Sequence, residues 1–392
     1  MYEARAAAPA ADLEAFGLHH ERGFLPHQDP LRRLPTPFDY WEEAAACLPK
    51  LLVSDRVREL LAKLPPFPVS LLHHEAMDRR AMLLLSYLGH AYVWGQREPV
   101  HQLPAFLARP WHHVASKLGR PPVLSYASYA LDNWYRLEQS GPIACGNIAL
   151  IQNFLGGIDE EWFILIHVEI EAKAAAVIRE VPEAQRALYA EDEAALATSL
   201  AKIEKGLEAM YDSLARMPEH CDPYVYYHRV RPYIHGWKNN PALPEGLVYE
   251  GVEEYAGKPQ AFRGETGAQS SIIPTLDALL GVFHEEDILK TYLLEMREYM
   301  PPKHRGFMEA VEAGPPMREF LKNCSKKTVA LYDACVGWVE RFRTLHLQYA
   351  ATYIFKQHQT DPSNPAKVGT GGTPFMKYLK KHRDETTKHA LG

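Results

Sequence analysis

Hydrophobic residues recur every three or four positions through long stretches of the chain, above all after residue 157. Within residues 162–179, one helical face carries Phe163, Ile166, His167, Ile170, Ala174 and Val177. The same periodicity predicts further helices over residues 194–217, 271–282, 286–299 and 327–353. This half of the chain shows no convincing run of strands, so we expect it to be all-helical.

The first part of the chain mixes short helical patterns with proline-rich connections, and residues 79–95 predict a buried helix. A turn-rich stretch from Gly141 to Gly157 then separates it from the long helices. The sequence therefore predicts a mainly α fold. A smaller, mostly helical N-terminal cap would span residues 1–150, and a large all-helical domain residues 151–392, since 392 residues are more than one ordinary domain holds.

Composition excludes several classes of protein. Hydrophobic residues make up 47% and charged residues 23%, as in an ordinary soluble enzyme, and the net charge of −6 argues against nucleic acid as the main partner. The sequence contains no apolar run of about 18 residues, so it predicts no membrane span. The N-terminus lacks the pattern of a secretory signal. The five cysteines are scattered without a C-x-x-C motif, which fits a reducing cytoplasm better than a disulfide framework or a zinc site.

The last long helix carries a histidine on its apolar face, which is formed by Val336, Val339, Arg343, His346, Ala350 and Tyr353. His346 is either a hydrogen-bonded core histidine or an axial heme ligand with Arg343 near a heme propionate. Spacing alone does not separate the two. His167, on the inner face of the helix over residues 162–179, is either a buried core histidine or a group above the iron.

Arg231 lies in a run of aromatic residues that begins at Tyr226 and Tyr227. It either stacks on surface aromatics or clamps a substrate carboxylate beside rings that enclose an aromatic group. Two glycine-containing loops, residues 262–271 and 369–374, allow close backbone approach to a ligand, although neither has the lysine spacing of a phosphate-binding loop. The basic tail, residues 377–389, predicts a solvated helix face.

Seven segments together resemble the indoleamine 2,3-dioxygenase family, within the indoleamine/tryptophan 2,3-dioxygenase superfamily. They are LGHAYVWG (88–95), RPPVLSYASYALDNW (120–134), GWKNNPALPEGLVYEG (236–251), FRGETGAQSS (262–271), REYMPPKHRGF (297–307), RTLHLQ (343–348) and GTGGTPFM (369–376). They follow the family's order over nearly the whole chain. The resemblance implies a monomeric, heme b-dependent dioxygenase. Such an enzyme inserts both atoms of O₂ across the indole C2–C3 bond of L-tryptophan, or a related indoleamine, and gives N-formylkynurenine for the kynurenine pathway of tryptophan catabolism.

The resemblance also assigns roles to residues. His346 matches the proximal heme ligand, Arg343 and Asp277 match a supporting pair on the same side, and Arg231 matches the arginine that binds the substrate carboxylate. The remaining matches are Tyr126, Tyr129 and Phe163 around the indole ring, Tyr226 and Tyr227 in the pocket lining, Gly264, Glu265, Thr266 and Gly267 beside the heme and oxygen site, and Thr370 in the loop that closes over the substrate ammonium.

Three positions depart from the family pattern. His167 stands where mammalian members have serine, which implies a distal pocket like that of tryptophan 2,3-dioxygenases, whose histidine meets the indole N–H. Tyr129 replaces a smaller residue, and Glu265 stands where glycine is usual. Three alternatives stay open: a heme enzyme that rearranges a halogenated tryptophan, a non-catalytic oxygen-binding heme protein, and a helical protein that has lost heme.

Overall fold

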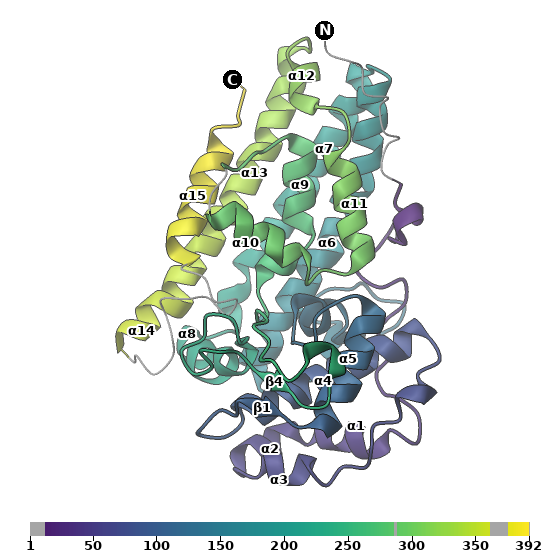
Figure 1. Ribbon diagram of the computed structural model, residues 1–392. Coiled ribbons are helices and arrows are strands. Elements are labelled where there is room, and N and C mark those ends of the chain that lie inside the picture. The colour runs from purple at the N-terminus through teal and green to yellow at the C-terminus, as the bar shows by residue number, and fades with distance from the viewer. Residues whose placement is uncertain (1–11, 286–287, 361–374, 392) are drawn as a thin grey trace.

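The fold is mainly α-helical, as the periodicity predicts. The computed structural model describes residues 12–285, 288–360 and 375–391 (Figure 1). Its α-helices are α1 (Asp39–Ala46), α2 (Leu48–Val53), α3 (Val57–Leu61), α4 (Glu75–Trp94), α5 (Ala105–Leu118), α6 (Ile158–Tyr189), α7 (Glu193–Ala215), α8 (Pro223–Val225), α9 (Ile272–Leu280), α10 (Ile288–Arg297), α11 (Pro302–Glu312), α12 (Met317–Leu321), α13 (Lys326–Ala350), α14 (Lys356–Thr360) and α15 (Phe375–Thr387). Among the described residues, no helix combines the length and apolar character that crossing a membrane requires.

The long helices stand together above a base formed by the first five (Figure 1). Helix α6 packs along α7, α7 along α13, and α13 along α15. Close approach of α6 and α7 depends on Gly206, because a Cβ atom at this position would lie only 2.4 Å from Cγ2 of Val177. The bundle therefore packs both α6 and α13, which carry the two candidate histidines, against α7.

Helix α6 begins where the turn-rich stretch ends, and acidic side chains fix its start. Three acidic residues occupy its first turn, where negative charge complements the helix dipole. One of them, Glu160, accepts the backbone N–H groups of Phe154, Leu155 and Gly156 at 2.6–3.0 Å. Burial raises the pKa of Glu160 to about 6, although these three hydrogen bonds act in the opposite direction. The carboxyl thus anchors the loop that leads into the helix.

Short strands join segments that are distant in sequence. β1 (Gln102–Leu103) pairs in parallel with β4 (Val248–Tyr249), and β2 (Trp134–Arg136) pairs antiparallel with β3 (Ile148–Leu150). β4 lies in the half of the chain that we expected to be all-helical. A strand of two residues is too short to show an alternation of apolar and polar positions.

Two large hydrophobic cores hold the structure together. One combines α1, α4 and α5 with later segments around Trp237, Tyr249 and Met296. The other combines α6, α7, α9 and α13 with the early residues Leu13, Leu18 and Phe24. Segments from both parts of the chain thus contribute to each core. The division at residue 150 stays a prediction.

Candidate active site

A cavity of about 310 Å³ lies between α6, α7, α9, α13 and the segment 265–270. Its wall is mostly apolar, as expected for a small-molecule site. Many residues that the sequence singles out meet on this wall, although they come from distant parts of the chain. They are Tyr126, Phe163, His167, Tyr226, Glu265, Thr266, Gly267, Asp277, Arg343 and His346.

Three π-helical turns border the cavity. Tyr126 directly precedes the first (η3, Ala127–Leu131), Tyr226 opens the second (η5, Tyr226–Val230), and Tyr353 lies in the third (η9, Ala351–Phe355). All three tyrosines line the cavity. A π-helical turn inserts an extra residue into a helix and is frequent at functional sites, because it redirects side chains locally.

His346 projects from α13 into this cavity. Burial lowers its pKa to about 4, and His167 contributes further in the same direction, so the imidazole is neutral at pH 7. Although His346 lies inside the fold, its side chain is accessible, because it faces the cavity. A neutral, accessible imidazole on a mostly apolar wall fits the single protein ligand of a heme iron. His346 and the apolar wall around it therefore fit a heme-binding site.

Arg343, one helical turn before His346, is held by an acidic partner on another helix. Its Nη2 lies 2.5 Å from Oδ2 of Asp277 on α9, and both residues line the cavity. Burial would raise the pKa of Asp277, but Arg343 and His284 outweigh burial and keep the pKa below its ordinary value. The ion pair places a cation near His346, where it fits a propionate of a heme.

His167 has a defined tautomer. Its Nδ1 lies 2.7 Å from the carbonyl oxygen of Phe163, and burial lowers its pKa. Because a carbonyl only accepts hydrogen bonds, Nδ1 must carry the proton, and the neutral ring leaves Nε2 as a bare acceptor. Edge contacts with Phe163 and Tyr126 at centroid distances of 4.8 and 6.0 Å hold the ring in place.

A buried carboxyl joins two cavity walls. Glu171, one turn after His167 on α6, accepts hydrogen bonds from Tyr126 Oη at 2.9 Å and Ser270 Oγ at 2.8 Å. Burial raises the pKa of Glu171 to about 7. Sequence reasoning missed this role of Glu171 and Ser270, although the spacing of four residues from His167 placed Glu171 on the same helix face.

Glu265 is a second buried carboxyl on the cavity wall, with 4% of its surface exposed. Burial raises its pKa to about 8, so at pH 7 the carboxyl is protonated and can donate a hydrogen bond. The residue is a neutral donor as long as the pH stays below about 8.

Replacing Glu265 with glutamine is expected to stabilise the protein more at pH 8 than at pH 5. The pKa is raised from 4.5 to about 8 in the folded state, so folding holds a proton that the unfolded chain releases. The contribution of Glu265 to the free energy of unfolding therefore falls by about 1.4 kcal/mol per pH unit across this interval, whereas the amide of glutamine does not titrate. Thermal unfolding of both proteins at each pH measures the difference, and an equal stabilisation at both pH values would contradict the burial of this carboxyl.

Four predicted site residues that the structure describes do not line the cavity. Tyr129 and Tyr227 are buried, and Arg231 is 0% exposed with its guanidinium carbon 5.6 Å from the Tyr227 ring centroid. Gly264 passes close to another backbone, since a Cβ atom there would lie 2.2 Å from the amide nitrogen of Gly236. Thr370 lies outside the described residues.

Comparison with known proteins identifies the family of the chain. A family model described as indoleamine 2,3-dioxygenase matches residues 12–389. The chain is 38% identical to indoleamine 2,3-dioxygenase 1 of Rattus norvegicus, over 97% of this chain and 95% of the relative. It is 31% identical to indoleamine 2,3-dioxygenase 2 of Homo sapiens, with the same coverage. It is 33% identical to indoleamine 2,3-dioxygenase of Saccharomyces cerevisiae, over 97% of this chain and 94% of the relative.

Proposed function

The chain belongs to the indoleamine 2,3-dioxygenase family, and we propose that it is a heme-dependent dioxygenase that converts L-tryptophan, or a related indoleamine, to N-formylkynurenine. The observation that carries the proposal is His346, a neutral imidazole that faces a mostly apolar cavity, which His167 also lines. His346 would hold the heme b iron, and Arg343, fixed by Asp277, would meet a propionate. When bound, heme supplies the iron chemistry that activates O₂.

The chain's own residues orient the substrate. Arg231 carries a guanidinium whose planar fork matches a carboxylate in two charge-assisted hydrogen bonds, and it would meet the substrate carboxylate after turning from its buried position beside Tyr227 toward the cavity. The aromatic rings of Tyr126, Phe163 and Tyr226 line the cavity and provide flat apolar surfaces for an indole. Thr370 would meet the substrate ammonium, and the apolar wall keeps water away from the reacting bond.

His167 would position the indole through its N–H group. The bare Nε2 atom can accept this hydrogen bond, because Nδ1 is already committed to the carbonyl oxygen of Phe163. A lowered pKa keeps this nitrogen free of a proton at pH 7. The side chain therefore orients the indole ring. A proton that it takes from the indole nitrogen would return to that nitrogen, because N-formylkynurenine retains the N–H.

His167→Ala is expected to retain heme and to lower turnover of L-tryptophan by about ten- to a hundredfold, the effect of losing one positioned acceptor or base. Steady-state kinetics of the heme-loaded variant measure the loss. The matched control is binding of N1-methyltryptophan, which has no indole N–H, so the substitution should leave its affinity nearly unchanged. An equal loss of affinity for both compounds would make His167 a packing residue.

A second candidate function is the rearrangement of a modified tryptophan, such as a halogenated one, on the same scaffold. The observation that favours it is Glu265, because a neutral buried carboxyl on the cavity wall can donate a hydrogen bond to a substituent on the ring. Incubation with plain and chlorinated L-tryptophan, followed by mass analysis, separates the two functions. The product of a dioxygenase contains two more oxygen atoms than the substrate, whereas the product of a rearrangement does not contain them.

We further propose that the protein acts as a monomer in a reducing cytoplasm. All five cysteines are free thiols in the structure, and burial raises the pKa of Cys145 to about 12. A thiol with a raised pKa is a poor nucleophile and resists oxidation.

A further inference from the structure

His90 is a buried side chain of α4 that the proposed reaction does not use, although it lies in the segment LGHAYVWG (88–95) that the sequence singles out. None of its surface is exposed. Its Nδ1 lies 2.8 Å from the carbonyl oxygen of Tyr233, and its Nε2 accepts the backbone N–H of Leu124 at 3.0 Å. One imidazole ring therefore joins two segments that are distant in the chain.

The two backbone partners fix the form of the ring. A carbonyl oxygen only accepts a hydrogen bond and a backbone N–H only donates one, so Nδ1 carries the proton and Nε2 is bare. Burial lowers the pKa of His90 to about 3, although the bond to Tyr233 acts in the opposite direction, so the ring is neutral. Contact with the Trp237 ring, at a centroid distance of 4.8 Å, holds the imidazole in its plane. Because a buried backbone group without a partner is costly, both bonds stabilise the segments where they lie.

Each of the two segments leads to a residue of the proposed substrate site. Leu124 precedes Tyr126, whose ring lines the cavity, by two positions. Tyr233 lies two positions after Arg231 in the same 3₁₀ turn. His90 thus connects the backbone below a ring of the indole pocket with the backbone that carries the proposed carboxylate-binding arginine.

A third segment closes these connections into a circuit. The backbone N–H of Tyr126 donates to Oε1 of Gln269 at 2.9 Å, and Nε2 of Gln269 donates to the carbonyl oxygen of Gly264 at 2.9 Å. The backbone N–H of Glu265 donates to the carbonyl oxygen of Ile234 at 3.1 Å, which leads back to the 3₁₀ turn. The hydrogen bonds therefore form a closed circuit that begins and ends at the histidine.

Two further contacts brace this circuit. The backbones of Gly236 and Gly264 pass in close contact, since a Cβ atom at Gly236 would lie 2.1 Å from the amide nitrogen of Gly264. Trp94, one turn further along α4, donates its indole N–H to the carbonyl oxygen of His235 at 2.9 Å. The guanidinium of Arg231 can therefore turn toward a carboxylate while its backbone stays in place.

We propose that His90 is a positioning residue that holds the backbone of Arg231 at a fixed distance from Tyr126, and so matches the site to a substrate that carries both a carboxylate and an indole. This inference rests on the proposed function, in which Arg231 binds the carboxylate and Tyr126 lines the indole pocket. The bond to Tyr233 serves recognition of the carboxylate, and the bond to Leu124 serves recognition of the indole.

Two substitutions break one of these bonds each. Asparagine carries its amide nitrogen at about the position of Nδ1, so His90→Asn keeps the bond to Tyr233 and loses the bond to Leu124. Glutamine carries its amide oxygen at about the position of Nε2, so His90→Gln keeps the bond to Leu124 and loses the bond to Tyr233. Both variants lose the packing of the imidazole ring, so a difference between them reports the hydrogen bonds.

The test is titration of the heme spectrum with L-tryptophan and with tryptamine, which has no carboxylate. His90→Gln should bind L-tryptophan roughly two- to tenfold more weakly, the ratio that one neutral hydrogen bond supplies, and should bind tryptamine nearly as the wild type does. His90→Asn should weaken binding of both compounds by a similar factor, because both contain the indole. An equal loss for both compounds in both variants would make His90 a packing residue and overturn the proposal, as would wild-type affinities in both variants.

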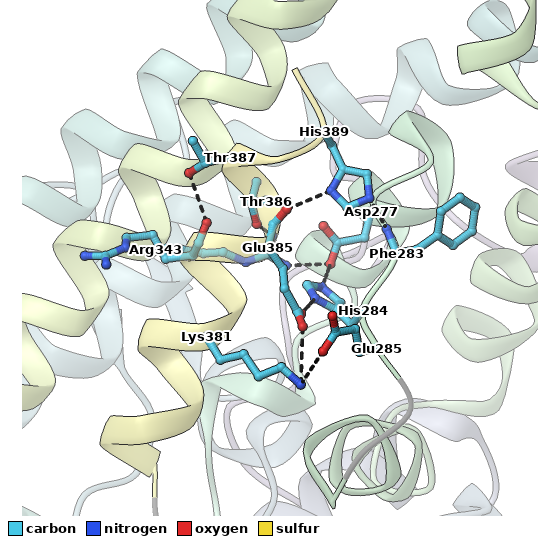
Figure 2. A network of polar contacts seen from close by, with 11 residues as sticks. Asp277, Phe283, His284, Glu285, Arg343, Lys381, Glu385, Thr386, Thr387 and His389 are labelled. Atoms are coloured by element: carbon cyan, nitrogen blue, oxygen red, sulfur yellow. Dashed lines mark hydrogen bonds and ion pairs between the residues drawn. The ribbon is translucent and has the colours of Figure 1, made fainter. Parts of the chain in front are cut away.

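His389→Gln is the matched control. This histidine also joins two backbone segments, since its Nε2 accepts the N–H of Phe283 at 3.1 Å and its Nδ1 lies 2.8 Å from the carbonyl oxygen of Glu385 (Figure 2). It follows α15 and does not line the cavity. The ratio of the two affinities in His389→Gln should equal the wild-type ratio, and a shift like that of His90→Gln would contradict a specific role for His90.

Hydrogen exchange of single backbone amides separates this inference from the proposed function, because it needs neither heme nor substrate. The Leu124 amide should exchange faster in His90→Asn than in the wild type, and the Glu265 amide, which donates to Ile234, should exchange faster in His90→Gln. This pattern supports the circuit through His90 even if L-tryptophan does not bind, and the proposed function is then at fault. Exchange that is the same at both amides in all three proteins contradicts the circuit even if L-tryptophan binds.

Discussion

Replacing His346 with alanine is expected to give a folded protein that no longer retains heme. The side chain faces the cavity and makes no hydrogen bond to another residue that the structure describes, so its removal should leave α13 intact. Alanine also favours a helix. Loss of the only proposed protein ligand should weaken heme binding by more than the roughly 10- to 100-fold that follows from changing an outer-shell partner. Heme content and the visible spectrum after reconstitution measure the effect.

Two further variants serve as controls for the loss of heme in His346→Ala. His167→Ala should retain heme, because His167 is proposed to act on the substrate and not on the iron. His346→Gly with added imidazole should regain a heme spectrum, since the free base can occupy the space of the lost ring. Heme binding by His346→Ala at the wild-type level would show that another group holds the iron.

Replacing Arg231 with methionine should keep heme and weaken binding of L-tryptophan by about 2–5 kcal/mol, the range for truncating one partner of a buried charge pair. The guanidinium is fully buried and lies beside the Tyr227 ring, and burial lowers its pKa. A substrate carboxylate that reaches the guanidinium would form a charge-assisted pair with it. Methionine preserves the apolar part of the side chain and removes the charge.

Tryptamine, which has the indole and the ammonium but no carboxylate, provides the control. Its affinity should change little in Arg231→Met, and titration of the heme spectrum with each compound gives both affinities. Arg231→Lys should recover only part of the L-tryptophan affinity, since an ammonium does not reproduce the planar fork. If Arg231→Met binds L-tryptophan as the wild type does, Arg231 is a structural residue.

The periodic part of the sequence predicted the fold well. On α13, the predicted apolar stripe is real: Val336, Val339, Ala350 and Tyr353 are all at most 7% exposed. This stripe required His346 to face inward, and the structure places it on the cavity wall. Local spacing suffices here because every member of the stripe belongs to one helix.

The sequence could not predict contacts that depend on distant partners. Residues 377–389 suggested a solvated helix face, but Glu385 and Thr386 are buried, at 4% and 0% exposure. Their burial follows from contacts with His284 and Arg343, which lie about a hundred and about forty residues earlier in the chain. The π-helical turns that orient Tyr126 and Tyr226 likewise follow from no local pattern in the sequence. Tyr129 was expected in the pocket, yet it does not line the cavity and contacts Phe163, with their ring centroids 6.3 Å apart.

The most direct test of the account is a single reaction of the heme-loaded protein with isotopically labelled O₂. The protein is reduced without oxygen, L-tryptophan is added, labelled O₂ is admitted, and the product is identified by absorbance and mass. The account predicts N-formylkynurenine that carries both labelled oxygen atoms. A heme spectrum that does not respond to L-tryptophan, with no oxygenated product, would contradict the dioxygenase function and favour an oxygen-binding protein on the same scaffold.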